Sequence, residues 1–128
     1  MKNVRLALLA TMGLILLATG AAFAHHGTAN YDTTKTITIK GSVTDFQFIN
    51  PHVLVALDVK DDTGKVVNWQ GALTSPNRLT RTGWTKDSLK NGATVTLSGF
   101  PAKSGAPEIW IQKVVLGDGH ELALDGGN

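Results

Sequence analysis

Apolar residues in this chain recur at every second position over most of its length, and this period restricts the fold more than any other feature. Ile37, Ile39 and Val43 share one parity, and a second run repeats the pattern from Val53 to Val59. Alternation with a period of two is typical of strands that bury one face. The sequence therefore predicts a protein built mainly from strands.

The first of these strands is expected to be long and bent. Phe46 and Phe48 lie on the opposite parity from the apolar residues before them, so the register must shift within the strand. Gly41 and the pair Thr44-Asp45 lie where a β-bulge or bend would produce that shift. Asn50-Pro51 then interrupts the chain.

The remaining pattern predicts further strands through residues 53–59, 65–73, 108–116 and 121–124 and one with Ala93, Val95 and Leu97 facing inward. A short helix is expected over residues 76–82, with Ser75 as N-cap before a proline and Gly83 as the stop signal. This order is the connectivity of an OB-like barrel with five to six strands and one short helix between strands 3 and 4. An open β-sandwich is the alternative.

The first 24 residues form a predicted secretory signal peptide. Lys2 and Arg5 supply the positive start, residues 6–17 the apolar stretch, and Ala22-Phe23-Ala24 the cleavage box. An uncleaved anchor is the alternative, although the run is short for a bilayer span. Cleavage after Ala24 would place the chain in the periplasm without a stable membrane anchor. Residues 25–35 would form an N-terminal leading segment and residues 36–125 a single barrel domain.

The charge balance argues against a nucleic-acid partner. Without Lys2 and Arg5 the chain carries ten basic and ten acidic side chains, so it is neutral when the histidines are counted as neutral. Affinity for nucleic acids depends on Lys and Arg that neutralise phosphates. The chain has no cysteine, so the domain must be stabilised by its core alone.

Several short motifs form a recurring set. They are His25-His26-Gly27, Asn50-Pro51-His52, Ser75-Pro76 with Leu79, Arg81, Gly83 and Trp84, Leu89-Lys90-Asn91-Gly92, and the stretch from Gly99 to Gly105. The set resembles a family of small exported bacterial proteins known only as a domain of unknown function. The resemblance implies an exported single-domain β-protein and assigns no activity to any residue.

The histidines are the strongest candidates for chemistry. Cleavage after Ala24 would make His25 the N-terminus, whose α-amine and imidazole can chelate one ion, with His26 beside them. Copper(II) suits such nitrogen ligands in a tetragonal array. His52 or His120 would supply a further nitrogen. The alternative is that the first two histidines are only a polar tail.

A second candidate is a ligand face on the barrel. The rim of an OB barrel would lie at residues 48–52 and 100–107, where Trp110 could stack on a ligand and Lys103 could contact it. Arg78 and Arg81, three residues apart on the helix, could bind an anion. The alternative is that the tryptophans pack in the core and the arginines are solvated.

No catalytic motif accompanies these candidates. The sequence has no cysteine nucleophile, no G-x-S-x-G elbow, no H-E-x-x-H and no phosphate-binding glycine pattern. The favoured interpretation is a periplasmic, non-enzymatic binding module for a small ligand, a metal ion or another periplasmic protein. The alternative is a copper-dependent redox protein or enzyme that uses His25.

Overall fold

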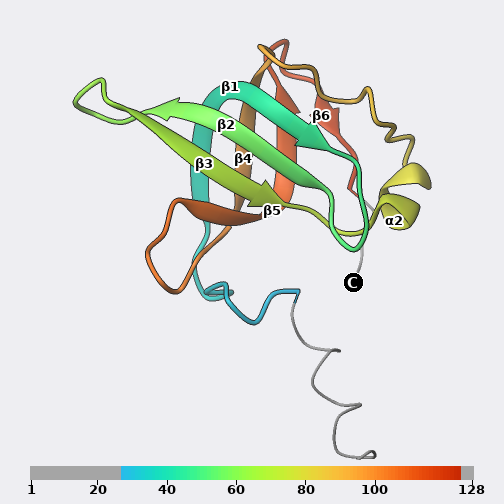
Figure 1. Ribbon diagram of the computed structural model, residues 1–128, viewed down its shortest axis with the longest axis horizontal. Helices are drawn as coiled ribbons and strands as arrows, with labels where there is room; N and C mark the ends of the chain where they lie inside the picture. The colour runs from blue at the N-terminus through green and yellow to red at the C-terminus, as the bar shows by residue number, and fades with distance from the viewer. Residues whose placement is uncertain (1–26, 125–128) are drawn as a thin grey trace, which may run out of the picture.

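The computed structural model describes residues 27–124 of the 128-residue chain. Six strands and one short helix follow one another in Figure 1. They are β1 (Ile37–Gln47), β2 (Leu54–Lys60), β3 (Val66–Ala72), α2 (Pro76–Thr80), β4 (Thr94–Pro101), β5 (Glu108–Leu116) and β6 (Glu121–Leu122). The β2–β3 hairpin projects from the body of the protein (Figure 1).

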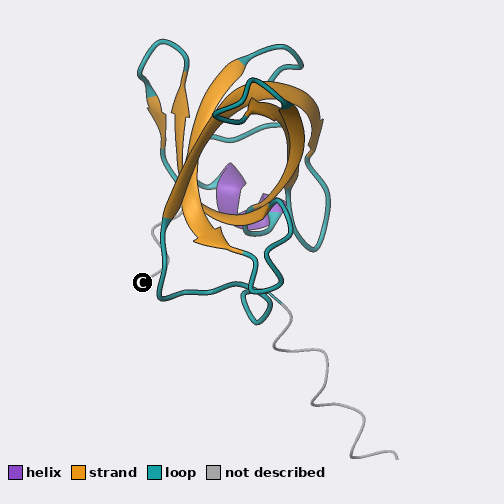
Figure 2. Cartoon of the chain, turned by 90° about the vertical axis from the view of Figure 1, so that its left-hand side faces the viewer, coloured by secondary structure: helices purple, strands orange, loops and turns teal. Residues whose placement is uncertain are grey.

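The strands close into a barrel. The sheet order is β3-β2-β1-β4-β5-β6, and a parallel pairing of β3 with β5 joins the two sides. That closing seam is short, because it joins only Gln70, Gly71 and Ala72 to Glu108, Ile109 and Trp110. Figure 2 shows the resulting ring of strands with the helix beyond its opening. The predicted OB-like barrel is confirmed, and the sandwich alternative is wrong.

Strand β1 serves both halves of the barrel, as its sequence predicts. Its first half pairs with β4 and its second half with β2. The register shifts between Val43 and Asp45, so the bulge lies at the predicted position. Gly41 lies so close to β2 that a β-carbon there would overlap the Asp58 carbonyl. The glycine therefore permits the close crossing that the bend requires.

The core lies inside the ring of strands and extends to α2. Val95 and Leu97, which were expected to face inward, are fully buried, and Val55, Leu57, Ile109 and Ile111 on β2 and β5 are buried as well. The segment between β3 and β4 adds Leu79, Trp84 and Leu89 to the same cluster. Trp84 is thus a core residue, and its indole Nε1 donates a 2.8 Å hydrogen bond to the Ala123 carbonyl.

The ends of two predicted elements differ from the structure. The helix stops at Thr80, two residues before the predicted end. Gly83 follows with φ +93°, and the Trp84 amide donates a hydrogen bond to the Leu79 carbonyl. Ser75 is the N-cap, but its hydroxyl makes no capping hydrogen bond, so capping does not explain this serine. Strand β6 ends at Leu122, two residues before the predicted end, and the carbonyl of the next residue accepts the hydrogen bond from the Trp84 indole.

Candidate functional site

His52 lies in the turn between β1 and β2. A cis peptide bond joins Asn50 to Pro51 directly before it. The next residue, Val53, is fully buried, and its backbone exchanges hydrogen bonds of 3.2 and 2.8 Å with Thr74 and Leu73. Because Val53 is fixed in the core and successive side chains alternate, His52 points away from the core.

The ring of His52 is half-buried and packs on Trp110. The two ring centroids are 5.2 Å apart with an interplanar angle of 84°, an edge-to-face contact. The Nδ1 atom of His52 is buried, and it has no hydrogen-bond partner in the part of the chain that the structure describes. Buried polar side-chain atoms normally have partners, so this nitrogen requires an explanation.

Trp110 is held on the outside of β5 by the burial of its neighbours. Ile109 and Ile111 face the core, so the residue between them faces outward. Its ring lies 5.8 Å from that of Tyr31, which extends the contact with His52 into an aromatic row. The role of Trp110 as a stacking surface stays a prediction, and the structure places its indole beside the ring of His52.

Residues 27–35, here called the strap, pack against the loop after β4. Tyr31 forms a β-bridge with Ala102, and the Lys103 amide donates to the Asn30 carbonyl at 2.9 Å. The Lys103 ammonium donates to the Ala29 carbonyl, also at 2.9 Å. Lys103, a predicted ligand-face residue, therefore binds the strap.

The strap also stabilises its own turn. The side-chain and backbone groups of Thr34 donate to the Asp32 carboxylate, and the Lys35 ammonium lies 3.2 Å from it. These donors hold the pKa of Asp32 below its ordinary value. Burial, and next the Glu108 carboxylate, raise the pKa of the Tyr31 hydroxyl, so Tyr31 stays neutral in its position against β5.

The first residue of the strap, Gly27, lies beside the rings of His52 and Trp110. A β-carbon placed on Gly27 would lie 4.0 Å from Cε1 of His52 and 3.8 Å from the Trp110 ring, which is ordinary contact. We call Gly27, His52 and Trp110 the His52 site. His25 and His26 lie outside the described residues, but they directly precede Gly27 in the sequence.

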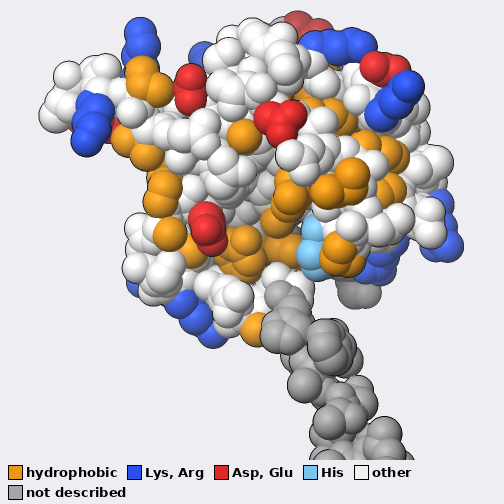
Figure 3. All heavy atoms as spheres, in the orientation of Figure 1, with side chains coloured by type: hydrophobic (Ala, Val, Ile, Leu, Met, Phe, Trp, Pro, Cys, Tyr) orange, Lys and Arg blue, Asp and Glu red, His pale blue; other side chains and the backbone are white. Residues whose placement is uncertain are grey.

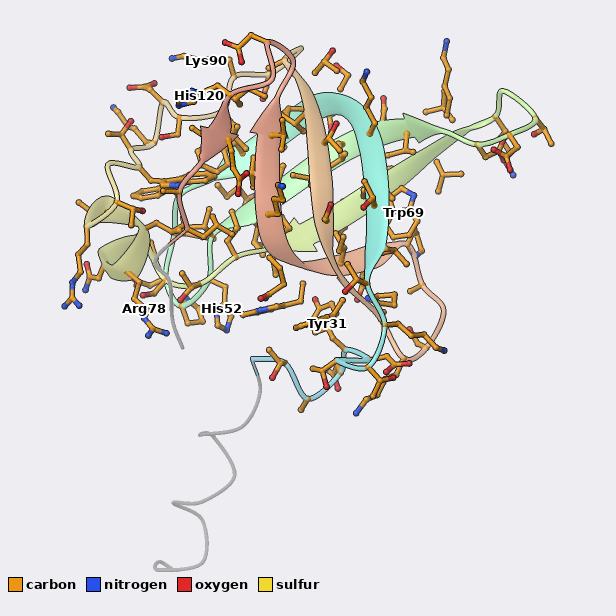
Figure 4. The ribbon with its side chains drawn as sticks, turned by 180° about the vertical axis from the view of Figure 1, so that it is seen from behind. Tyr31, His52, Trp69, Arg78, Lys90 and His120 are labelled. Atoms are coloured by element: carbon orange, nitrogen blue, oxygen red, sulfur yellow. The ribbon has the colours of Figure 1, made fainter. Side chains whose placement is uncertain are left out.

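The other predicted site residues lie elsewhere. His120 is exposed in the β5–β6 turn, where its amide bonds to Asp118, and Figure 4 shows it on the opposite side of the molecule from His52 and Tyr31. Arg78 and Arg81 are exposed at α2, and Arg78 lies on the His52 side of the molecule (Figure 4). Within residues 27–124 no three His, Cys, Asp or Glu side chains are grouped to hold a metal.

Hydrophobic side chains surround the exposed edge of the His52 site. Figure 3 shows them gathered over the end of the barrel near the β1–β2 turn, with a histidine at the surface among them. Ile49 and Leu54, on either side of this turn, are 48% and 37% exposed. The surroundings of the site are therefore partly apolar. The strap contacts were missed by sequence reasoning, although Tyr31 is the one large apolar side chain in that polar segment.

Comparison with known proteins identifies the family. The sequence model of a family of unknown function, DUF6152, matches residues 13–109. The chain belongs to DUF6152. A search of curated proteins finds no match to this DUF6152 chain. Among the described residues, no helix is long and apolar enough to cross a membrane.

One solved structure supports the fold of this DUF6152 protein. Rim1, a mitochondrial single-stranded DNA-binding protein from S. cerevisiae, is similar with a TM-score of 0.50 and 11% identity over 64% of this chain and 92% of that one. TiaS in a complex with tRNA and ATP gives a TM-score of 0.48 and 21% identity, over 73% of this chain and 20% of that chain. At such identities the likeness concerns the fold alone.

Proposed function

We propose that this DUF6152 protein is an exported, non-enzymatic binding module that holds a metal ion at the His52 site. The proposed ligands are His52 and the two histidines before Gly27. The ion that best suits them is copper(II), since amine and imidazole nitrogens favour its tetragonal geometry. The observation that carries the proposal is the buried, unpartnered Nδ1 of His52.

An unpartnered buried nitrogen destabilises the fold by about 1–3 kcal/mol. A neutral imidazole has one N–H and one lone pair, and only the lone pair can bind a metal. Cε1, which is bonded to Nδ1, faces Gly27. Because Cε1 lies between the two ring nitrogens, a ligand that precedes Gly27 would approach the edge of the ring that carries both of them, including the unpartnered Nδ1.

The distance along the chain fits this arrangement. Consecutive Cα atoms are about 3.8 Å apart, so two residues before Gly27 span less than about 8 Å. The length of chain between Gly27 and the two histidines is therefore short enough for the proposed contact with His52. If the leader is cleaved after Ala24, the α-amine and imidazole of His25 form a chelate on the same ion.

The proposed location is the periplasm, where the cleaved chain would be neutral. We propose no nucleic-acid partner, because the balance of ten basic and ten acidic side chains offers no phosphate-binding excess. The fold that Rim1 shares therefore serves a different ligand here.

The test compares copper(II) binding by four forms of the protein in calorimetry. The first begins at His25, as intact-mass spectrometry confirms, and the second carries one extra alanine before His25. The third is His52→Ala, and the fourth is His120→Ala, a matched control on the opposite side of the molecule. Extension and His52→Ala should each weaken binding sharply, whereas His120→Ala should bind like the parent.

Equal binding by His52→Ala and the parent would contradict the proposal, since the histidines would then be an ordinary polar tail. The same samples address the alternative of a copper redox enzyme. The protein's rate of oxygen consumption in the presence of ascorbate is compared with that of free copper. A higher rate that is lost in His52→Ala would favour that alternative. Tight binding without such turnover supports a binding module.

A further inference from the structure

We infer that the strap determines the affinity of the His52 site, with Lys103 and Tyr31 as its positioning residues. This inference rests on the proposed metal site and adds a determinant that is not itself a ligand. Lys103 was expected to contact a ligand on the barrel rim, whereas here it acts through the strap, and Tyr31 lies in the strap itself. Both connect the strap to the barrel beside Trp110.

The strap is anchored to the end of β4 and the loop after it by contacts of different kinds. The Asp32 amide donates a 2.8 Å hydrogen bond to the carbonyl of Pro101, the last residue of β4. Tyr31 forms a β-bridge with Ala102, which follows Pro101. Lys103 adds its amide and its ammonium to the carbonyls of two consecutive strap residues. The strap backbone is therefore fixed in position and direction.

The anchors lie very close to the proposed ligands. The carbonyl of Ala29 accepts the Lys103 ammonium and is only two residues from Gly27, where a β-carbon would lie 4.0 Å from Cε1 of His52. A chelating tail that is already fixed at this point loses less conformational freedom when it binds metal, so its affinity is higher. The anchors therefore determine the fraction of molecules in which the two histidines before Gly27 are positioned to bind the metal ion together with His52.

Lys103 is suited to this role because it acts on the backbone. Its ammonium binds the carbonyl of residue 29, so the contact does not depend on the side chain there. Tyr31 contributes its ring, which packs at 5.8 Å against the Trp110 ring. The two anchors can thus be removed separately, one polar and one aromatic.

Coupling of this kind is reciprocal. If the docked strap raises the affinity for metal by some factor, bound metal must favour the docked strap by the same factor. Metal should therefore slow hydrogen exchange of the backbone amides that hold the strap, those of Asp32 and Lys103. This consequence is measurable in the unmodified protein.

The experiment uses the chain that begins at His25, with copper(II) alone as the probe. Lys103→Met and Tyr31→Ala should each weaken copper binding by about five- to tenfold, the size expected when one docking contact is lost and the competent fraction falls. Lys103→Arg and Tyr31→Phe keep a donor and a ring, and they should restore most of the affinity. Lys65→Met, in the distant β2–β3 loop, is the matched control.

The electron paramagnetic resonance spectrum of bound copper separates positioning from ligation. It should stay the same in Lys103→Met, because the ligands are unchanged, and change in His52→Ala. Parental affinity in both strap variants, while His52→Ala loses binding, would overturn this inference and leave the metal site in place. Parental affinity in all three would overturn both.

Amide exchange in the parent protein tests the inference without a substitution, so the result does not depend on whether the variants fold. Copper should slow exchange at Asp32 and Lys103 about as much as the strap variants weaken binding. Unchanged exchange at these amides, with copper bound, would overturn the inference regardless of how the variants fold.

Discussion

The buried Nδ1 of His52 has no hydrogen-bond partner among the described residues, which is unfavourable to folding, and the proposed role as a metal ligand would account for a histidine at this position. A phenyl ring would keep the edge contact with Trp110 and remove the buried polar atom. His52→Phe should therefore leave the free energy of unfolding unchanged or raise it by about 1 kcal/mol. Urea unfolding of the metal-free protein measures this.

His120→Phe is the control for that substitution. His120 is exposed, so its replacement should change stability by less than about 0.5 kcal/mol. A loss of more than about 1 kcal/mol in His52→Phe would mean that the histidine stabilises the turn itself, in conflict with the buried unpartnered nitrogen.

Leu97 tests the inward face of β4. Its side chain is fully buried in the barrel core. Leu97→Ala should lower the free energy of unfolding by about 2–5 kcal/mol, the usual range for truncating a buried leucine. Chemical denaturation measures the loss, and a value below about half a kcal/mol would contradict the assignment of this face.

At the scale of elements, two glycines beside Trp110 differ in the space around them. A β-carbon on Gly99 would overlap the Trp110 backbone carbonyl, at the point where the β4–β5 register shifts. Gly27 offers ordinary contact distances instead. Gly99→Ala should destabilise the fold by about 1–3 kcal/mol or more, as overpacking does.

Thermal unfolding of both variants measures the difference, and Gly27→Ala should be close to neutral. The comparison thus separates a glycine required by the barrel from one that lies at the proposed site. Equal stability of the two variants would contradict the close approach of β4 to β5.

The strap and the metal should respond to acid at different pH values. Because the folded pKa of Asp32 is lowered, the stability it contributes is present above its ordinary pKa of 3.8 and is lost as pH falls through the folded value. Protons also compete with a metal ion for imidazole and amine nitrogens, so metal affinity falls in acid. On acidification copper should leave first, and the strap should stay docked until the pH is below 3.8.

Copper absorbance and the amide chemical shift of Thr34, followed together against pH, measure this order of events. A Thr34 shift that changes along with the copper signal would contradict it. At alkaline pH the contribution of Tyr31 to stability depends on pH in the opposite direction. The raised pKa of Tyr31 favours its neutral form in the fold, so its contribution is present below pH 10.0 and falls as pH rises above that value.

The strands were predictable because alternation is a local property of the chain. The bulge near Thr44 was predictable for the same reason, since a change of parity is visible in neighbouring residues. The strap was not predictable. Its anchor joins Lys103 to Ala29, 74 positions apart, through a backbone carbonyl that carries no side-chain signal.

The candidate site shows the same division. His52 stands out in the sequence because it follows Asn50-Pro51 at a turn. Its partner Trp110 and its neighbour Gly27 are brought to it only when the barrel closes. The separation of His120 from His52 also depends on that closure, which places the two turns on opposite sides of the molecule (Figure 4).

At the scale of the whole molecule, the His52 site lies beside the seam that closes the barrel. Trp110 pairs with Ala72 across that seam and carries the ring that touches His52. A ligand bound only by the folded state at 100 times its Kd adds about 2.7 kcal/mol of stability. For a domain of this size the midpoint of thermal unfolding should rise by on the order of 10 °C.

Scanning calorimetry with and without copper measures that rise. His52→Ala should unfold at a temperature that copper does not change. An equal rise in this variant would show that copper stabilises the protein through other groups.

The shortness of the seam has a consequence for concentrated solutions. Pairing between β3 and β5 begins only at Gln70, so the earlier part of β3 presents an open strand edge, with Val66 51% exposed. Such an edge is a template on which a second chain can add a strand. Here it is only a few residues long and adjoins the charged hairpin loop with Asp61, Asp62 and Lys65, which opposes stacking of one molecule on another.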